Sequence, residues 1–324
     1  MIYSKFNERK TIGVFAPSSG LGDRIEKLNT TLDFFENLGY NVKITDSTFN
    51  DSVVSGTPEI RVKEFEELLL DDDIDIIFCA CGGEFAIEIA SLLNFDLVKD
   101  YPKYIVGFSD STLLTYLVTT NSDVASITSY NFINVYRVIK DKSLDDLLKV
   151  LDGKLITQEM FNMYEKEKIE DKMMVDTKNE YFSNRRNINI SGRIIGGTIE
   201  VLSEIIGMPY DKTNTFLNKY KSDGIIWYFD ICEMNSNDFY RTLVRMNQLN
   251  YFDDVKLVLI SKMPKWCEEK DITFEESLTK VFGDIPIIRN VDIGHLYPKI
   301  TIVNGSIANV VFKNGKFLIS FTYE

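Results

Sequence analysis

Residues 74–83, IDIIFCACGG, decide the fold of the first part of the chain. They form a short apolar run that ends in two glycines, and residues 84–93 after it have the apolar spacing of a helix. Two further apolar runs, TIGVFAP at 11–17 and YIVGF at 104–108, are also followed by helical patterns. Such alternation is typical of βαβ units, so we predict an α/β domain with a mostly parallel sheet over residues 1–153.

A polar segment separates this region from a second apolar one. Residues 154–189 are rich in lysine, glutamate and asparagine, as in EKEKIEDKMM, and show little apolar periodicity, so we predict a linker there. Strand-like runs then return, among them GIIWYFDI at 224–231, VKLVLIS at 255–261 and ITIVNGSIANVVF at 300–312. Because 324 residues exceed the ~100 to 200 of one average domain, we expect a second domain over residues 190–324.

The charge balance narrows the classes of partner. Lysine and arginine together number 36 against 49 aspartates and glutamates, which gives a formal net charge of -13. Such a field repels phosphate backbones and anionic lipid headgroups, so we expect neither a nucleic acid nor a membrane as partner. The longest uninterrupted apolar run, Ile76 to Cys81, is far shorter than the ~20 residues that span a bilayer. A small-molecule or peptide ligand fits better.

The four cysteines indicate the redox environment. Their spacing matches neither a disulfide framework nor a CxxC zinc motif. Cys79 and Cys81 alternate within an apolar strand pattern, which favours core packing over metal binding. We therefore expect reduced thiols and a cytoplasmic location.

The chain has a single histidine, His295. It stands in VDIGHLYPK between two predicted strands, a loop position where active-site groups often lie. If the chemistry needs a histidine, it is this one. An ordinary surface or hydrogen-bonded histidine is an equally good interpretation of the sequence alone.

Ser109 follows the run YIVGF in GFSDST and precedes a predicted helix. A serine at a sharp strand-to-helix turn resembles a nucleophile elbow, although Ser111 replaces the second glycine of G-x-S-x-G. Taken alone, the pattern favours a serine that caps the helix. Gly82 and Gly83 end the neighbouring strand, and Gly83 together with the amide of Asp110 could form an oxyanion hole. The alternative is a tight turn that needs glycine.

A base at His295 needs a carboxylate that orients it. Asp230 and Glu233 lie at the end of the apolar run, in YFDICEMN. Asp230 is the better candidate because it is the first charge after that run, where an unpaired acid would be costly. Either residue could instead be a capping or surface acid.

Six ordered blocks resemble the serine LD-carboxypeptidase family, peptidase family S66, which includes the muramoyltetrapeptide carboxypeptidases and the microcin C immunity peptidases. They are IGVFAPSS, CGGEFAIEIASLLNFD, GFSDSTLLTYLVTT, GRIIGGTIEVLSEIIGMPYD, IIWYFDICEMNSNDFYRTLVRMNQL and VDIGHLYPKITIVNGSIANV. The resemblance implies that Ser109 is the nucleophile, that His295 is the general base and that Gly83 and Asp110 supply the oxyanion donors. The family's acid is usually glutamate, and the matching position here is Asp230, with Glu233 as the alternative.

The resemblance also implies a fold and an activity. The expected fold is a flavodoxin-like N-terminal domain and a β-rich C-terminal α/β domain, usually in a homodimer. The expected activity is hydrolysis of an L,D peptide bond next to a C-terminal residue, without a metal or organic cofactor. The substrate would be a muropeptide of peptidoglycan recycling, or a peptidyl-nucleotide amide of the kind handled in microcin immunity. The alternative is a catalytically weakened peptide-binding protein with the same fold. A flavodoxin-like nucleotide binder is disfavoured because no GxGxxG or P-loop follows the first strand.

Overall fold

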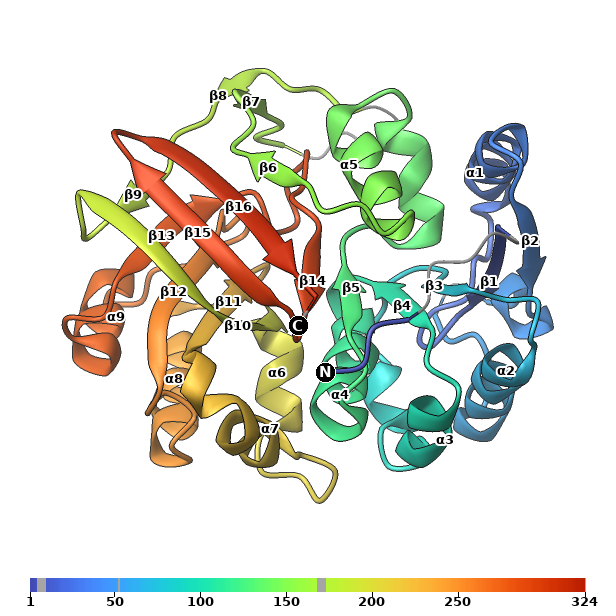
Figure 1. The fold of residues 1–324 in the computed structure, drawn as a ribbon, viewed down its shortest axis with the longest axis horizontal. Helices are drawn as coiled ribbons and strands as arrows, with labels where there is room; N and C mark the ends of the chain where they lie inside the picture. Colours follow the sequence, from blue (N-terminus) through green and yellow to red (C-terminus); the bar gives the residue numbers. More distant parts are fainter. Residues whose placement is uncertain (5–9, 52, 168–172, 324) are drawn as a thin grey trace. The chain divides into compact units, whose positions relative to one another are not determined.

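The computed structural model describes residues 1–4, 10–51, 53–167 and 173–323. Their contacts divide the chain into two compact units, each with its own sheet (Figure 1). The first unit comprises residues 1–156 with 301–305 and 323, and the second comprises residues 157–300 and 306–322.

The first unit contains a six-stranded sheet in the order β14-β5-β4-β3-β1-β2. Strands β1 to β5 are parallel, and β14 is antiparallel to β5. Apart from β14, this is the 2-1-3-4-5 order of flavodoxin-like sheets, so the expected fold is confirmed. The strands are β1 (Thr11–Phe15), β2 (Asn41–Ile44), β3 (Ile76–Cys79), β4 (Tyr104–Gly107), β5 (Ser126–Thr128) and β14 (Ile302–Asn304).

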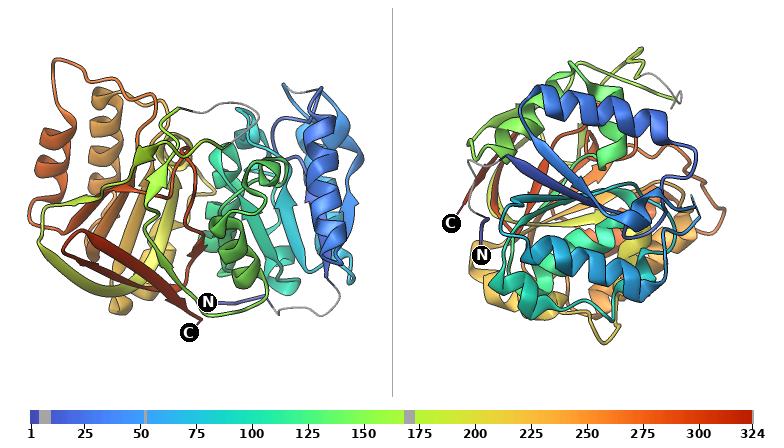
Figure 2. Two further views of the ribbon diagram at one scale, coloured as in Figure 1. Left: turned by 90° about the horizontal axis from the view of Figure 1, so that it is seen from above. Right: turned by 90° about the vertical axis from the view of Figure 1, so that its right-hand side faces the viewer.

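Helices cover both faces of the first sheet (Figure 1). On one face lie α1 (Ile25–Asn37), the 3₁₀ helix η4 (Phe132–Val138) and α5 (Lys142–Leu151), and on the other lie α2 (Pro58–Leu70), α3 (Phe95–Asp100) and α4 (Thr112–Ser122). The right-hand view of Figure 2 shows α1 and α2 on opposite sides. Three short 3₁₀ helices, η1 (Asp46–Phe49), η2 (Ala86–Ile89) and η3 (Ser109–Ser111), follow strand ends.

Aromatic side chains fill the core between the first sheet and its helices. The rings of Phe35 and Phe132 stack with centroids 5.3 Å apart, and those of Phe15 and Phe65 stack at 5.2 Å. Each of these four side chains is at most 1% exposed. Burial of such large apolar surfaces on both faces explains why the strands of this unit are apolar runs rather than alternating patterns.

The second unit contains an eight-stranded sheet in the order β6-β16-β15-β10-β11-β12-β13-β9. Strands β10 to β13 are parallel, and the outer strands are antiparallel. This arrangement confirms the β-rich α/β expectation. Its strands are β6 (Thr157–Glu159), β9 (Phe182–Ser183), β10 (Asn187–Thr198), β11 (Ile225–Asp230), β12 (Val255–Ser261), β13 (Ile287–Val291), β15 (Ile307–Lys313) and β16 (Lys316–Thr322), and a separate pair is formed by β7 (Met163–Tyr164) and β8 (Thr177–Lys178).

Each pair of neighbouring parallel strands in the second unit is joined through helices. These are α6 (Ile199–Ile205), α7 (Thr213–Tyr220) and the 3₁₀ helix η5 (Lys221–Asp223), then α8 (Ser236–Gln248), then α9 (Phe274–Phe282). Because crossovers of this kind are right-handed and the four strands are adjacent in chain order, the helices share one face of the sheet. Because β10 and β11 are parallel neighbours, their carboxyl ends lie side by side at the same end of the sheet, where α6 begins.

Two segments differ from the sequence expectation. The run at 300–312 divides between the sheets, because β14 belongs to the first and β15 to the second, with Gly305 (φ +82°) between them. Within the segment expected as a linker, residues 154–189, β6 and β9 form the two edges of the second sheet. No helix among the described residues is long and apolar enough to cross a membrane.

Candidate active site

Ser109 lies at a strained turn between β4 and α4. Its φ is +63°, a left-handed conformation that costs a non-glycine residue roughly 1 to 2 kcal/mol. The buried Asn131 holds the preceding residue from both sides: its Oδ1 accepts from the Phe108 amide and its Nδ2 donates to the Phe108 carbonyl, each at 2.9 Å. This is the kind of strand-to-helix turn that lifts a nucleophile above a sheet.

The glycine pair after β3 lies next to Ser109. A Cβ added to Gly82 would be 3.3 Å from Ser109 Oγ, so this backbone approaches the serine closely. Gly83 has φ +154°, and a Cβ there would lie only 2.2 Å from Ser18 Oγ and 2.4 Å from Ser19 Oγ. Gly83 therefore has no room for a side chain, whereas a side chain at Gly82 would fit only tightly against Ser109.

Side chains connect the segment after this glycine pair to the residues just before α4. Ser18 Oγ accepts from the Phe85 amide at 2.9 Å, and Asp110 Oδ2 accepts from the Ala86 amide at 3.0 Å. Asp110 is the residue after Ser109, and its side chain is buried. The segment two to three residues after Gly83 is thus hydrogen-bonded to the side chain of Asp110 and to that of Ser18.

We expect Gly83→Ala to lower both activity and stability. The new methyl group would overlap two serine side chains at a backbone conformation that L-residues rarely adopt, so the turn must move. Gly39→Ala is the matched control, because Gly39 also has a positive φ (+82°) but open space around it. The expected result is a loss of kcat with Gly83→Ala only, and a larger fall in Tm than for Gly39→Ala. Equal effects of the two variants would contradict the role of the turn.

Asp230 and His295 lie together in the second unit. His295 Nδ1 is 2.8 Å from Asp230 Oδ2, and their side chains are 21% and 1% exposed. Thr198, the register partner of Asp230 at the end of β10, donates its hydroxyl to Oδ2 at 3.0 Å. Ser261 Oγ donates to Oδ1 at 3.2 Å. A buried carboxylate with these partners can hold an imidazole in one orientation and stabilise its cationic form.

Gly294 makes room for this pair. A Cβ at Gly294 would lie 2.6 Å from Asp230 Oδ1 and 2.6 Å from the Ser261 Cβ. The loop can therefore bring His295 to the carboxylate only because the preceding residue has no side chain. The glycine and histidine of VDIGHLYPK are thus linked by packing.

The alternative acid, Glu233, lies in a different environment. Its side chain is 60% exposed and forms an ion pair with Lys265. Of the two acids that the sequence leaves open, the structure places Asp230 beside His295.

A buried network supports the other end of the histidine loop. Asp292 Oδ1 pairs with Lys262, Asp292 Oδ2 accepts from the Tyr181 hydroxyl at 2.6 Å, and the Asp292 carbonyl accepts from the Ile300 amide at 2.6 Å. Burial lowers the pKa of Lys262, and burial beside Asp292 raises the pKa of Tyr181 well above its usual value. These residues are not among those predicted from the sequence, although charges that directly follow the strands β12 and β13 are a usable signal of a buried pair.

Cys232, two residues after Asp230, provides a test of the charged environment around Asp230. Burial, together with the charges of Asp230, Glu200 and Glu233, raises the pKa of its thiol to about 12. At pH 8 only about one thiol in ten thousand is then ionised, so iodoacetamide should modify it far more slowly than the exposed Cys267. Peptide mass spectrometry should show the Cys232 rate rising about tenfold per pH unit. Equal rates for the two cysteines at pH 8 would contradict this environment.

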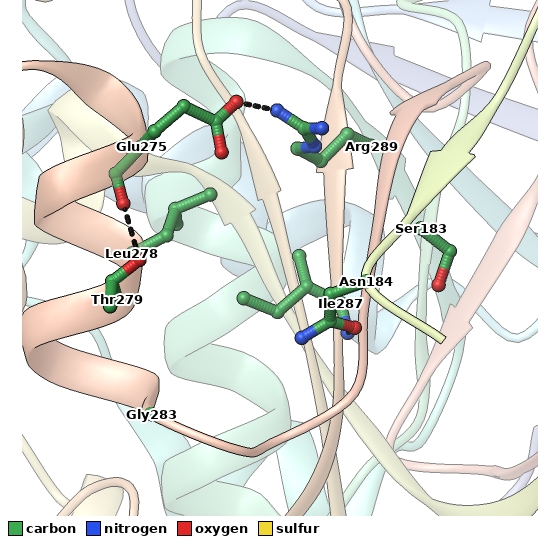
Figure 3. A pocket seen from close by; sticks show the side chains of 8 residues that line it. All are labelled: Ser183, Asn184, Glu275, Leu278, Thr279, Gly283, Ile287 and Arg289. Carbon is green, nitrogen blue, oxygen red and sulfur yellow. Dashed lines mark hydrogen bonds and ion pairs between the residues drawn. The ribbon is translucent and has the colours of Figure 1, made fainter. Parts of the chain in front are cut away.

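A pocket of ≈ 100 Å³ lies elsewhere in the second unit (Figure 3). It is lined by residues of α9, β13 and β9, and Glu275 and Arg289 point toward one another across it and form an ion pair. None of the predicted site residues lines it, so we do not assign the chemistry to it. No cluster of three or more potential metal-ligating side chains is found among the described residues.

The fold and its local chemistry define a class of α/β protein with a strained serine turn in one unit and a buried histidine–aspartate pair in the other. Comparison with known proteins identifies the family. The N-terminal domain of the LD-carboxypeptidase family matches residues 12–129, and its C-terminal domain matches residues 191–310. The chain belongs to this family, peptidase family S66.

Individual relatives agree with this assignment. The chain is 25% identical over 308 residues to the "Probable murein peptide carboxypeptidase" of Bacillus subtilis (strain 168), covering 93% of this chain and 88% of the relative. It is 24% identical over 314 residues to the microcin C7 self-immunity protein MccF of Escherichia coli, covering 90% and 87%. The structure of MccF in complex with glutamyl sulfamoyl guanosine has the same fold, with a TM-score of 0.84 at 22% identity over 100% of this chain and 98% of that chain.

Proposed function

We propose that the protein is a serine carboxypeptidase that hydrolyses an L,D peptide bond next to a C-terminal residue. The observation that carries this proposal is the 2.8 Å distance between the chain's only histidine and the buried carboxylate of Asp230. A histidine held in this way is suited to proton transfer. The strained turn at Ser109 supplies a serine of the kind such a base activates.

In this proposal Ser109, His295 and Asp230 act as a triad. Ser109 Oγ attacks the scissile carbonyl while His295 takes its proton, and the amides of Gly83 and Asp110 stabilise the oxyanion. His295 then gives the proton to the departing amine, leaving an acyl ester on Ser109. Water attacks this ester with His295 again as base, and the serine is restored. Each proton is accounted for by these side chains, so the reaction needs no metal or organic cofactor.

The relatives suggest two substrate classes. One is named as a murein peptide carboxypeptidase, and MccF has been solved with an aminoacyl sulfamoyl nucleoside. We therefore propose either a muropeptide, as in peptidoglycan recycling, or a peptidyl-nucleotide amide, as in microcin immunity. We also propose a cytoplasmic homodimer, and light scattering of the purified protein tests the oligomeric state.

A second candidate function is a catalytically weakened peptide-binding protein. Aspartate at position 230, where the resemblance to the family implies glutamate, favours this second candidate. A fluorophosphonate probe separates the two candidates, because the hydrolase should be labelled at Ser109 and the binder should not. A panel of L,D and D,D tetrapeptides and an aminoacyl sulfamoyl adenosine then identifies the substrate class by mass spectrometry. Absence of both labelling and cleavage in folded protein would overturn the hydrolase.

A further inference from the structure

Glu200 lies near the start of α6 and contacts the turn that follows Asp230. Its Oε1 accepts hydrogen bonds from three consecutive backbone amides, those of Cys232 and Glu233 at 2.8 Å and that of Met234 at 3.0 Å. These amides follow the end of β11, where the sheet no longer supplies carbonyl partners. One carboxylate oxygen therefore determines the path of this turn through charge-assisted hydrogen bonds.

The same short segment also contacts the carboxylate of Asp230. Thr198, two residues before Glu200, donates its hydroxyl to Asp230 Oδ2 at 3.0 Å. Residues 198–200 thus contact the acid in two ways, through its side chain and through the backbone just after it. Movement of the turn would pull on the backbone of Asp230, which lies two residues before Cys232.

The burial of Glu200 is costly. Its Oε2 is buried and has no hydrogen-bond partner among the described residues. Burial raises the pKa of Glu200, and the nearby charge of Asp230 raises it further. A second carboxylate beside the triad acid is unfavourable in itself, so the three turn amides are the contacts that offset its burial.

We propose that Glu200 is a positioning residue, which fixes the turn at residues 232–234 and thereby holds Asp230 in line with His295. The effect on turnover rests on the proposed hydrolase function. The effect on the imidazole does not, because the Asp230 and His295 pair exists without substrate.

The experiment compares Glu200→Ala with Glu200→Gln. Glutamine keeps an oxygen that can accept from the turn amides, whereas alanine removes it. Glu204→Ala is the matched control, since it removes an acidic side chain from an exposed position of the same helix. On a cleaved peptide, Glu200→Ala should lower kcat by about 10- to 100-fold with little change in KM, Glu200→Gln should restore most of kcat, and Glu204→Ala should match the wild type.

The single histidine supplies a readout that a purely structural role would not change. Nitrogen NMR of the His295 ring should show the Nδ1-protonated tautomer in the wild type, Glu200→Gln and Glu204→Ala, and a mixture of tautomers in Glu200→Ala. Unchanged kcat and tautomer in Glu200→Ala would overturn the proposal, as would equal losses in alanine and glutamine. If the wild type cleaves no peptide, the hydrolase proposal fails, while the tautomers still decide the role of Glu200.

Hydrogen exchange in the wild type tests the proposal even if Glu200→Ala does not fold. The amides of residues 232–234 should be protected, although they lie in a turn outside the sheet. Exchange as fast as in exposed loops would overturn the proposal.

Discussion

Ser109→Ala should abolish hydrolysis, with kcat reduced by about 10⁴-fold or more. The reason is that the nucleophile itself is removed, whereas Asn131 still holds the backbone of Phe108, just before the turn, through two hydrogen bonds. Measured on a cleaved peptide, the variant should be inactive, and its Tm should stay close to that of the wild type. Full activity in Ser109→Ala would end the assignment of the nucleophile.

Two controls separate chemistry from structure at this turn. Ser111→Ala changes a buried serine two residues away, whose hydroxyl donates to the Cys81 carbonyl at 3.0 Å, so it should reduce stability and leave most of the activity. Ser109→Gly should be as inactive as Ser109→Ala, because it also lacks the hydroxyl. The free energy of unfolding of Ser109→Gly should nevertheless equal that of Ser109→Ala or exceed it by up to about 1 kcal/mol, because glycine tolerates φ +63°.

Features that depend on local pattern could be predicted from the sequence. The strand β12 has the expected bounds, 255–261, because it is an apolar run between clear breaks. The turn at Ser109 could also be predicted, since a strand pattern ends just before it and a helical pattern begins just after it. The strain at Ser109 could not, because φ depends on the packing around the turn.

Features that depend on distant partners escaped prediction. Residues 84–93 have helical spacing, but only the short η2 forms there, and its first amides bond to side chains distant in sequence, Ser18 and Asp110. The roles of Asn131 and Glu200 rest on backbone groups more than 20 residues away in sequence. The choice between Asp230 and Glu233 likewise needs the position of the histidine loop, which the sequence does not give.

Asp230→Asn should be severely impaired, with kcat reduced by up to about 10⁴-fold. The amide keeps the shape of the side chain but loses the charge that stabilises the imidazolium, and its NH₂ group can face His295 Nδ1 and favour the wrong tautomer. Glu233→Gln is the matched control, three residues along the same segment. It breaks an exposed ion pair with Lys265, a contact worth about 0 to 1 kcal/mol, so kcat should change little.

The outcome of this pair decides the acid, provided that circular dichroism shows both variants folded. A silent Asp230→Asn with a damaging Glu233→Gln would move the role to Glu233. Asp230→Glu is a third informative variant, because it introduces the residue that the resemblance to the family implies at this position. Asp230 Oδ2 is already 2.8 Å from His295, and Gly294, Thr198 and Ser261 crowd the carboxylate, so an extra methylene must displace its neighbours. We therefore expect Asp230→Glu to retain only part of the wild-type kcat. An increase in kcat would mean that the shorter acid of this chain holds His295 less well than glutamate does.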